Sequence, residues 1–336
     1  MKTLVCTTPG YFEYTERDHP SPKKGSTILR IRRIGICGTD LHAFEGTQPY
    51  FNYPRVLGHE LAATIEETDA EGFKKGDEVT IIPYFPCGEC IACRNGKTNC
   101  CVSLQVGGVH TDGGMAEYLS VPSYSLQHGE GLSFDELALV EPLAIGAHAV
   151  RRAGISANEF VLVMGAGPIG LGTMEFARIA GGRVIAMDIN EDRLNFCKQR
   201  LKIEHIVNAS SADVNDQLTT ITNGDMPTVV IDATGNLKAI NHAFQYLAHS
   251  GRYVLVGLQR ENILVNHPEF HKREATLMSS RNATRDDYMN VINSMKKRLV
   301  DPATYINHRV HFADVKDSFA GWLDPANKVI KAMVIM

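Results

Sequence analysis

The stretch VLVMGAGPIGLG (residues 161–172) decides the fold of the second half of this chain. Its glycines, Gly165, Gly167 and Gly170, have the spacing G-x-G-x-x-G. That spacing alone is weak evidence, but here it follows an apolar run typical of a strand and opens a helical pattern from Pro168 to about residue 180. The first glycine permits a tight turn, the second a close backbone approach to a ligand, and the third close helix–strand packing. Free N–H groups at such a helix start suit phosphates, and the helical pattern here begins with Pro168 and Ile169.

The next apolar run, RVIAMD, ends at Asp188. A carboxylate at this point can accept hydrogen bonds from ribose hydroxyls and would repel a 2′-phosphate. The nearest cationic side chain that follows is Arg193. The pattern therefore favours NAD over NADP, and the alternative is a glycine-rich turn without a ligand. Further cofactor contacts are expected after the later strands, at Thr234, Gly257, Leu258, Arg281 and Asn282.

Apolar strand-like runs alternate with helical patterns from residue 147 to about residue 282. This alternation predicts an α/β domain with a parallel sheet covered on both faces. Residues 1–146 are instead rich in Gly, Pro and short β-type runs, which indicates an irregular all-β body. After residue 283 we expect a helix over 285–299 and a final strand in KVIKAMVIM that returns to the first domain. The expected domains are thus 1–146 with 283–336, and 147–282.

The stretch CGECIACRNGKTNCC (residues 87–101) holds four thiols with the spacing C-x2-C-x2-C-x7-C, at Cys87, Cys90, Cys93 and Cys101. One short loop can wrap a single ion with these sulfurs, which is the closed arrangement of a structural zinc site. The predicted lobe covers about residues 84–102. The alternatives are a chance cluster or a pair of disulfides. The other cysteines, Cys6, Cys100 and Cys197, need no role.

A second group of candidate metal ligands is scattered along the first domain. Cys37 lies in IGICGTDLH, His59 and Glu60 lie in VLGHE, and Glu141 begins EPLAIGAHAV. Each alone is more often a core or surface residue. Together they offer about three ligands and an open position, as a catalytic zinc requires. Such a zinc can activate an alcohol, whose carbon then gives a hydride to a nicotinamide. We therefore expect two zinc ions per chain.

Thr39 and His42, which follow Cys37 closely in the chain, could carry a proton. The hydroxyl of Thr39 could take it from the reacting alcohol, and the imidazole of His42 could pass it to water. The alternatives are a capping threonine and a surface histidine. Asp40 could orient a metal ligand.

Composition narrows the class of partner. The chain has 336 residues, of which 44% are hydrophobic and 21% charged, and a formal net charge of −4. That charge offers no basic surface for nucleic acid. The N-terminus has no apolar signal segment, and no apolar run approaches the ~20 residues of a membrane span. We expect a cytoplasmic protein without a membrane or nucleic-acid partner.

These motifs resemble the zinc-dependent medium-chain dehydrogenase/reductase family over the whole chain. The matching stretches are GICGTDLH, GHE, the four-cysteine lobe, DGGMAEY, EP, and GAGPIG with Asp188. The resemblance implies a GroES-like β-barrel catalytic domain, a Rossmann domain, and a dimer or tetramer. It implies that Cys37 and His59 bind the catalytic zinc. Glu141 stands where alcohol dehydrogenases place a cysteine, as in the polyol and L-threonine branch, and Glu60 binds directly or alternates with water.

Further stretches, including NYPRVLGHE, PEFHKRE and SSRNAT, resemble bacterial enzymes that oxidise L-galactonate or L-gulonate at C5. The implied substrate is a small polar sugar acid. Its carboxylate would suit His110 or Arg281 with Asn282, although Arg281 could equally contact the cofactor. Tyr50, Phe51 and Tyr53 could line the site or simply pack. The alternatives are a polyol or L-threonine dehydrogenase with the same machinery and, from another class, a non-catalytic NAD-binding zinc protein.

Overall fold

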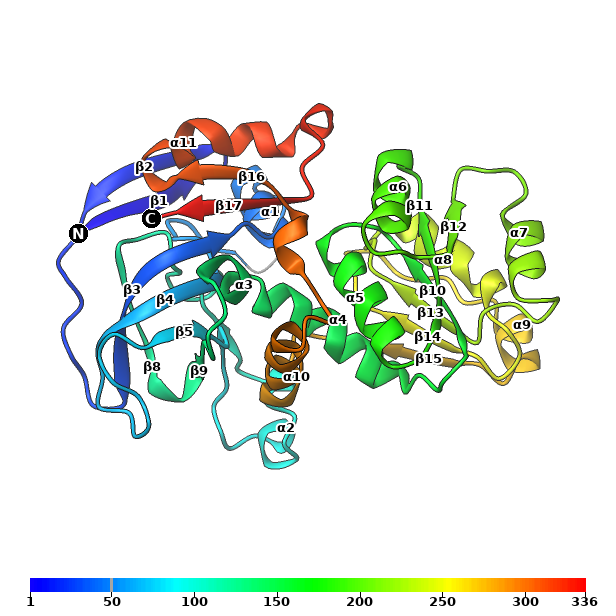
Figure 1. The fold of residues 1–336 in the computed structure, drawn as a ribbon, viewed down its shortest axis with the longest axis horizontal. Coiled ribbons are helices and arrows are strands. Elements are labelled where there is room, and N and C mark those ends of the chain that lie inside the picture. Colours follow the sequence, from blue (N-terminus) through cyan, green and yellow to red (C-terminus); the bar gives the residue numbers. More distant parts are fainter. Residues whose placement is uncertain (49–50) are drawn as a thin grey trace. The chain divides into compact units, whose positions relative to one another are not determined.

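The computed structural model describes residues 1–48 and 51–336. The chain forms two compact units (Figure 1). Unit 1 consists of Met1–Pro142 and Thr284–Met336, and unit 2 of Leu143–Ala283. The sequence placed these boundaries at 146/147 and 282/283. No helix in the described ranges is long and apolar enough to cross a membrane.

Unit 2 is built on one parallel sheet of six strands in the order β12-β11-β10-β13-β14-β15. The order reverses between β10 and β13, and ligands of such sheets bind at the carboxyl ends of the strands beside that reversal. The strands are β10 (Phe160–Met164), β11 (Arg183–Asp188), β12 (His205–Asn208), β13 (Val229–Asp232), β14 (Arg252–Leu255) and β15 (Thr276–Ser279).

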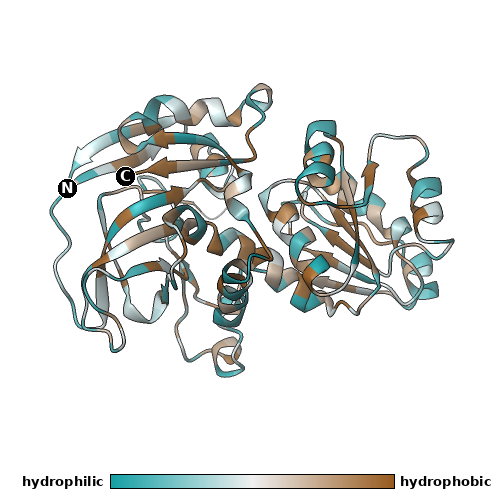
Figure 2. Ribbon diagram, in the orientation of Figure 1, coloured by the Kyte–Doolittle hydropathy of each residue, from teal (hydrophilic) through white to brown (hydrophobic). Residues whose placement is uncertain are grey.

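The central strands of unit 2 are buried on both faces, because the helices that connect parallel strands pack against the sheet. Val161, Leu162 and Val163 of β10 are all fully buried. Figure 2 shows these strands as hydrophobic, whereas the helices around them carry hydrophilic residues. The helices are α4 (Val140–Ala153), which begins in unit 1, α5 (Pro168–Ile179), α6 (Glu191–Gln199), α7 (Val214–Ile221), α8 (Leu237–Ala243) and α9 (His267–Lys272).

Unit 1 is mainly β-structure. Its largest sheet has the order β16-β17-β3-β4-β5-β9, with β8 paired to β3. The strands are β3 (Ser26–Gly35), β4 (Glu60–Glu67), β5 (Glu78–Ile81), β8 (Tyr118–Pro122), β9 (Leu126–His128), β16 (Ile306–His311) and β17 (Lys331–Ile335), and β1 (Lys2–Thr8) forms a separate hairpin with β2 (Tyr11–Glu16). Strand β17 returns antiparallel to β3, with Met333 opposite Gly35. That return carries Lys331 to the end of β3.

The four cysteines lie in a lobe closed by a short neck. Strand β6 (Tyr84–Phe85) pairs with β7 (Gln105–Val106), and the lobe between them contains α2 (Ile91–Arg94) and a 3-10 turn at Thr98–Cys100. The neck has two residue pairs, Tyr84 with Val106 and Phe85 with Gln105.

The helices of unit 1 are where the sequence reading was incomplete. An all-β body was expected before residue 146, but the structure contains α1 (Gly38–Glu45), α3 (Phe134–Ala138) and the start of α4. Helix α10 (Arg285–Lys296) ends slightly before the expected residue 299, and α11 (Val315–Ser318) follows it. In unit 2, α8 ends at Ala243, where a 3-10 turn, Phe244–Tyr246, follows directly.

Candidate functional site

The candidate catalytic metal centre lies in unit 1, where β3 and β4 run side by side. Gly35, the last residue of β3, is paired with Glu60, the first residue of β4. Cys37 follows β3 as the N-cap of α1, and His59 immediately precedes β4. This register brings the ligand atoms of Cys37, His59 and Glu60 within 4.8 Å of one another. The three residues that the sequence singled out separately therefore form one group.

Asp40 fixes the two segments that carry these ligands. It is fully buried, and its Oδ2 accepts a hydrogen bond from the Cys37 N–H at 2.9 Å. Its Oδ1 accepts from the Gly58 N–H at 3.1 Å and lies 3.7 Å from Nδ1 of His59. One carboxylate thus anchors the backbone beside both candidate ligands.

Glu60 has a cationic partner that the sequence reading missed. The Nζ of Lys331, on β17, donates hydrogen bonds to Oε1 of Glu60 at 2.6 Å and to the carbonyl of Ile36 at 2.9 Å. Both side chains are buried. A Cβ on Gly35 would lie 2.1 Å from Oε2 of Glu60, so only glycine leaves room for this pair. Lys331 stands 271 residues from Glu60 in the chain, and nothing local in the sequence links the two.

Glu141 lies near this group but outside the set of mutually close ligand atoms. It is in the first turn of α4 and is 4% exposed. The hydroxyl of Tyr84, another residue that the sequence reading missed, donates a hydrogen bond to its Oε1. Burial is the main reason that the pKa of Glu141 is raised to about 6, and the nearby His59 works in the opposite direction.

The charge balance of this pocket suits a cation. Burial disfavours the protonated imidazole of His59, but Asp40, Cys37 and Glu141 outweigh it and raise the pKa of His59 well above its usual value. Nδ1 of His59 is buried and has no hydrogen-bond partner among the described residues. A thiol, an imidazole and carboxylates are ligands that zinc prefers, so the residues present fit this ion. A zinc ion bound there would polarise an alcohol oxygen and lower its pKa.

The candidate proton carriers both lie on α1. Thr39 is half-buried, and the side chain of His42 is 62% exposed. Nδ1 of His42 lies 3.3 Å from Oε2 of Glu45 and 3.2 Å from the hydroxyl of Thr47. The imidazole is therefore open to water.

Other residues predicted for the substrate end have local partners. Nδ1 of His110 accepts a hydrogen bond from the Val106 N–H at 3.0 Å. The rings of Phe51 and Tyr53 pack edge-to-face on each other, with 4.8 Å between their centroids, and both lie against the core of unit 1. The hydroxyl of Tyr53 donates a hydrogen bond to the carbonyl of Ala43 on α1. Tyr50 lies outside the described residues.

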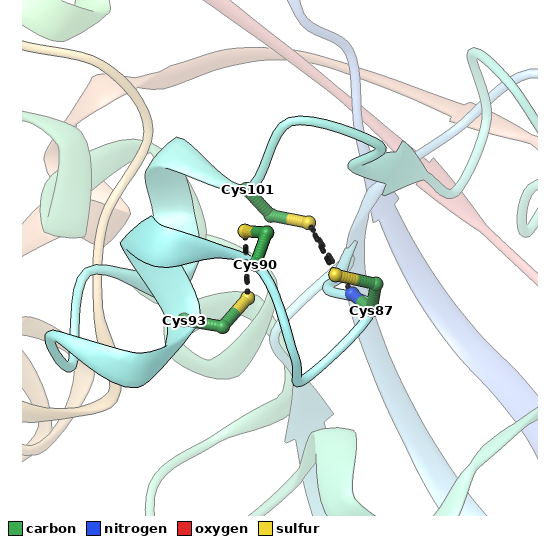
Figure 3. A group of neighbouring side chains, drawn as sticks. All are labelled: Cys87, Cys90, Cys93 and Cys101. Atoms are coloured by element: carbon green, nitrogen blue, oxygen red, sulfur yellow. Dashed lines mark hydrogen bonds between the residues drawn. The ribbon is translucent and has the colours of Figure 1, made fainter.

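The four cysteines of the lobe converge on one point (Figure 3). The sulfurs of Cys87 and Cys101 are 3.5 Å apart, as are those of Cys90 and Cys93. These distances exclude disulfides, whose S–S bond is about 2.05 Å, and approach the roughly 3.8 Å between sulfurs around a tetrahedral zinc.

The surroundings of the lobe shift the pKa values of its thiols in both directions. Hydrogen bonds from the backbone of Cys93 and Val102 lower the pKa of the Cys90 thiol to about 6, and the backbone of Cys87 lowers that of Cys101. Burial instead raises the pKa of Cys93 to about 12. Because the thiolate is the metal ligand, the lobe fits a closed four-sulfur zinc site.

The candidate dinucleotide site lies at the carboxyl ends of the strands of unit 2. Gly165 follows β10 with φ +96°, a left-handed conformation that favours glycine. A Cβ on Gly170 would lie 1.7 Å from the carbonyl oxygen of Gly165, so this position admits no side chain. The space beside Gly167, the N-cap of α5, is open. The turn, the close packing and the open approach that the motif predicts are therefore all present.

Asp188 closes this loop from the next strand. Its Oδ2 accepts a hydrogen bond from the Ala166 N–H at 2.6 Å, and its Oδ1 accepts from the Asn190 N–H at 2.9 Å. The residue is 8% exposed. Each oxygen retains a lone pair that a ribose hydroxyl could use. Arg193 lies on α6 and is half-buried.

A buried carboxylate that the sequence reading missed, Asp232, organises the loops after β13 and β14. It accepts hydrogen bonds from the hydroxyl of Thr234 at 2.5 Å and from the Gly235 N–H at 3.1 Å. A Cβ on Gly257 would meet the Gly235 nitrogen at 2.1 Å. The motif DATGN could have revealed Asp232, because an acid that ends a buried strand requires partners.

The last predicted cofactor residues lie on exposed loops. Leu258 is 66% exposed, and Arg281 is exposed after β15. Asn282 has φ +51°, and its buried Nδ2 has no partner among the described residues. Asn282 thus retains a donor that a ligand could use.

The chain matches two known family models. Residues 23–128 match the alcohol dehydrogenase GroES-like domain, and residues 168–297 match the zinc-binding dehydrogenase model. The chain is similar to the L-galactonate-5-dehydrogenase of Escherichia coli K12, with 40% identity over 99% of this chain and 98% of that protein. It is also similar to the sorbitol dehydrogenase of Halalkalibacterium halodurans, with 30% identity over 92% of each chain.

The fold is likewise similar to solved structures. One is a short chain alcohol dehydrogenase (rspB) of Escherichia coli CFT073, which was crystallised in complex with NADH. It matches with a TM-score of 0.92 and 30% identity, over 100% of this chain and 99% of that one.

Proposed function

Because this chain belongs to the zinc-binding alcohol dehydrogenase family, we propose that it oxidises a sugar acid, L-galactonate or L-gulonate, at C5 and transfers the hydride to NAD. Family membership makes it an oxidoreductase that acts on CH–OH groups. The observation that carries the substrate class is the 40% identity, along the full chain, to a dehydrogenase named for L-galactonate.

The roles of the residues follow from the chemistry of each group. Cys37, His59 and Glu141 hold the catalytic zinc, with Glu60 beside them. Thr39 receives the proton of the alcohol, and His42, which is open to water, releases it. Cys87, Cys90, Cys93 and Cys101 hold a structural zinc that supports the fold.

In unit 2 the N-terminus of α5 binds the pyrophosphate of the cofactor through free N–H groups. Asp188 accepts hydrogen bonds from the ribose and excludes a 2′-phosphate, which favours NAD. Arg281 and Asn282 offer donors to the cofactor or to the substrate carboxylate, and His110 offers an imidazole. A guanidinium in particular suits a planar carboxylate.

NADH formation by the zinc-replete protein tests this proposal. The substrate panel is L-galactonate, L-gulonate, D-sorbitol, xylitol and L-threonine. We expect a clear preference for the two sugar acids. Turnover of a neutral polyol or of L-threonine would retain the zinc and NAD chemistry and reject the sugar-acid substrate. The family includes a sorbitol dehydrogenase at 30% identity, so a polyol is the specific alternative.

A matched control separates the two metal sites. Cys37→Ser should retain the zinc of the lobe, lose the catalytic zinc and lose turnover. A wild-type protein that holds one zinc per chain, in the lobe alone, would contradict the catalytic role and favour a non-catalytic NAD-binding protein.

The edge of the sheet in unit 2 supports a homo-oligomer. Strand β15 ends the strand order, and its Thr276, Leu277 and Ser279 are exposed. An unpaired edge with an exposed apolar residue such as Leu277 favours pairing with another chain. A second copy paired along β15 would cover it. Light scattering should report a dimer or larger species, and Leu277→Lys should shift it toward the monomer.

The thiols support a reducing compartment such as the cytoplasm. All eight cysteines are free, and four of them are gathered for a metal. An oxidising compartment would favour disulfides within that group instead.

A further inference from the structure

The phenol of Tyr84 is the one hydrogen-bond donor to the side chain of Glu141 among the described residues. Tyr84 begins β6 and is 6% exposed, and Glu141 lies in the first turn of α4 and is 4% exposed. The hydroxyl occupies Oε1, which leaves Oε2 available to another partner. We propose that Tyr84 is the positioning residue of the catalytic metal site, and that it holds Glu141 with one free oxygen for the metal.

Tyr84 can act only as a donor in this contact. An ionised carboxylate has no proton to give, so the hydroxyl of Tyr84 must donate its proton to Oε1 of Glu141. Hydrogen bonds to a charged acceptor are roughly twice as strong as neutral ones. A carboxylate buried beside this phenol is therefore fixed in orientation without losing its charge.

Glu141 and Glu60 differ in the charge of the groups that bind them. The ammonium of Lys331 forms an ion pair with Glu60, whereas the direct partner of Glu141 is a neutral phenol. A divalent cation gains more from an uncompensated carboxylate than from one already paired with a cation. Glu60 lies closer to Cys37 and His59, but this difference in partners makes Glu141 the better third ligand. The inference thus rests on the proposed function, which already places Glu141 among the zinc ligands, and adds the residue that orients it.

The position of Tyr84 depends on the neck of the four-cysteine lobe. Tyr84 pairs with Val106 across the neck, and Phe85 with Gln105. Cys87 follows Tyr84 by three positions. A metal that closes the lobe therefore also holds the strand from which the phenol reaches Glu141.

The test uses the full-length protein and Tyr84→Phe, which removes the hydroxyl and keeps the ring. The control is Tyr288→Phe. Tyr288, on α10, is fully buried beside Tyr84 and Glu141, and among the described residues its hydroxyl makes no hydrogen bond to Glu141. The readouts are zinc content, the competition of a chromophoric chelator for the catalytic zinc, the visible spectrum of the cobalt-substituted site, and the thermal midpoint.

Tyr84→Phe should keep both zinc ions in excess metal and a nearly unchanged thermal midpoint. It should bind the catalytic metal about 10- to 100-fold more weakly, as loss of a partner that orients a ligand does, and its cobalt spectrum should change. Its kcat should fall while KM for NAD stays close to that of the wild type. Tyr288→Phe should match the wild type in metal affinity and spectrum.

A double-mutant cycle tests whether Tyr84 acts through Glu141. In a Glu141→Gln background, Tyr84→Phe should have little further effect on the cobalt spectrum. Unchanged metal affinity and spectrum in Tyr84→Phe would overturn the inference and leave the proposed function intact. A wild-type protein with one zinc per chain would overturn both. If Tyr84→Phe fails to fold, Glu141→Gln alone decides: an unchanged cobalt spectrum overturns the assignment of Glu141 as ligand.

Discussion

At the scale of single residues, Asp188 serves two purposes. Its carboxylate accepts a hydrogen bond from the Ala166 N–H inside the glycine-rich loop, and in the proposed function it also accepts hydrogen bonds from the ribose of the cofactor. On that proposal, the shape of the glycine-rich loop and the choice between NAD and NADP depend on the same side chain. A substitution aimed at cofactor choice will also loosen the loop.

Asp188→Ala should weaken NADH binding about tenfold or more, because hydrogen bonds to charged groups contribute about 1.5–3 kcal/mol each. NADPH binding should not improve in proportion, since the loop loses its anchor, but the ratio of the two affinities should shift toward NADPH. Fluorescence titration with both cofactors measures this. Asp188→Asn, which can keep the acceptor for Ala166, is the control. An unchanged ratio in the alanine variant would remove Asp188 from cofactor selection.

Glu141 gives the metal-free protein a pH dependence. Its folded-state pKa, about 6, lies above the ordinary value of 4.5, so the folded state holds the proton more tightly than the unfolded state. This contribution to stability is complete below 4.5 and is lost as the pH rises through 6, for a total of about 2 kcal/mol. Zinc binding, which needs the carboxylate, should strengthen over the same interval.

Chemical denaturation of protein stripped of its catalytic zinc, at several pH values from 5 to 7, measures this effect. The wild type should lose stability with rising pH relative to Glu141→Gln, which cannot ionise at this position. Parallel stability curves for the two proteins would show that Glu141 titrates normally.

Which site residues the sequence could reveal depended on whether their signal was local. Cys37, His59 and Gly165 stand in short motifs whose spacing has a physical meaning, so the sequence alone singles them out as candidates. Tyr84 and Lys331 act through partners 57 and 271 residues away, and such pairs appear only when the fold is known. Their residue types are unremarkable in a strand.

At the scale of elements, the four-cysteine lobe is the part that depends most on its metal. It contains one short helix, one 3-10 turn and a neck of two residue pairs, and it contributes few residues to the core of unit 1. Without a metal, little holds its loops together. The free energy of metal binding is therefore largely the folding free energy of the lobe.

Cys87→Ser should remove the structural zinc and lower the thermal midpoint of the protein. The control is Cys100→Ser, because Cys100 is exposed and stands outside the set of four close sulfurs. Zinc analysis and thermal unfolding of both variants test the prediction. A Cys87→Ser protein that loses zinc but unfolds like the wild type would exclude a structural role for the lobe.

Elements with a strong periodic signal were predicted well, and those stabilised by context were not. The strands of unit 2 are continuous apolar runs because both of their faces are buried, and the sequence shows this directly. Helix α1 begins at Gly38 in a segment that reads as a glycine-flanked loop. Its start is instead fixed by the Asp40 carboxylate, which accepts from the Cys37 N–H.

At the scale of the whole molecule, each unit has its own hydrophobic core. One core is centred on residues such as Leu29, Ile31 and Leu57 of unit 1, and the other on Leu162, Ile185 and Val230 of unit 2. The two candidate metal sites lie in unit 1 and the candidate dinucleotide site lies in unit 2. Ligands of one unit should therefore stabilise mainly that unit.

Scanning calorimetry should show two transitions. NADH at a hundred times its Kd should stabilise unit 2 by about 2.7 kcal/mol and raise one transition, whereas a zinc chelator should lower the other. Asp188→Ala is the control, because its unit 2 transition should respond weakly to NADH. A single transition that moves as a whole with either ligand would contradict independent units.

The insertion of unit 2 between the two parts of unit 1 has a consequence for the order of synthesis. Glu60 leaves the ribosome 271 residues before Lys331, which corresponds to some tens of seconds at roughly 5–20 residues per second. During that time all of unit 2 is made, and its continuous chain can fold. The cysteine lobe, which closes within residues 87–101, can take its zinc early. The pocket of Cys37, His59 and Glu60 gains the Lys331 ammonium only when β17 has been synthesised. The candidate catalytic site is therefore the last of the sites to be completed on the nascent chain.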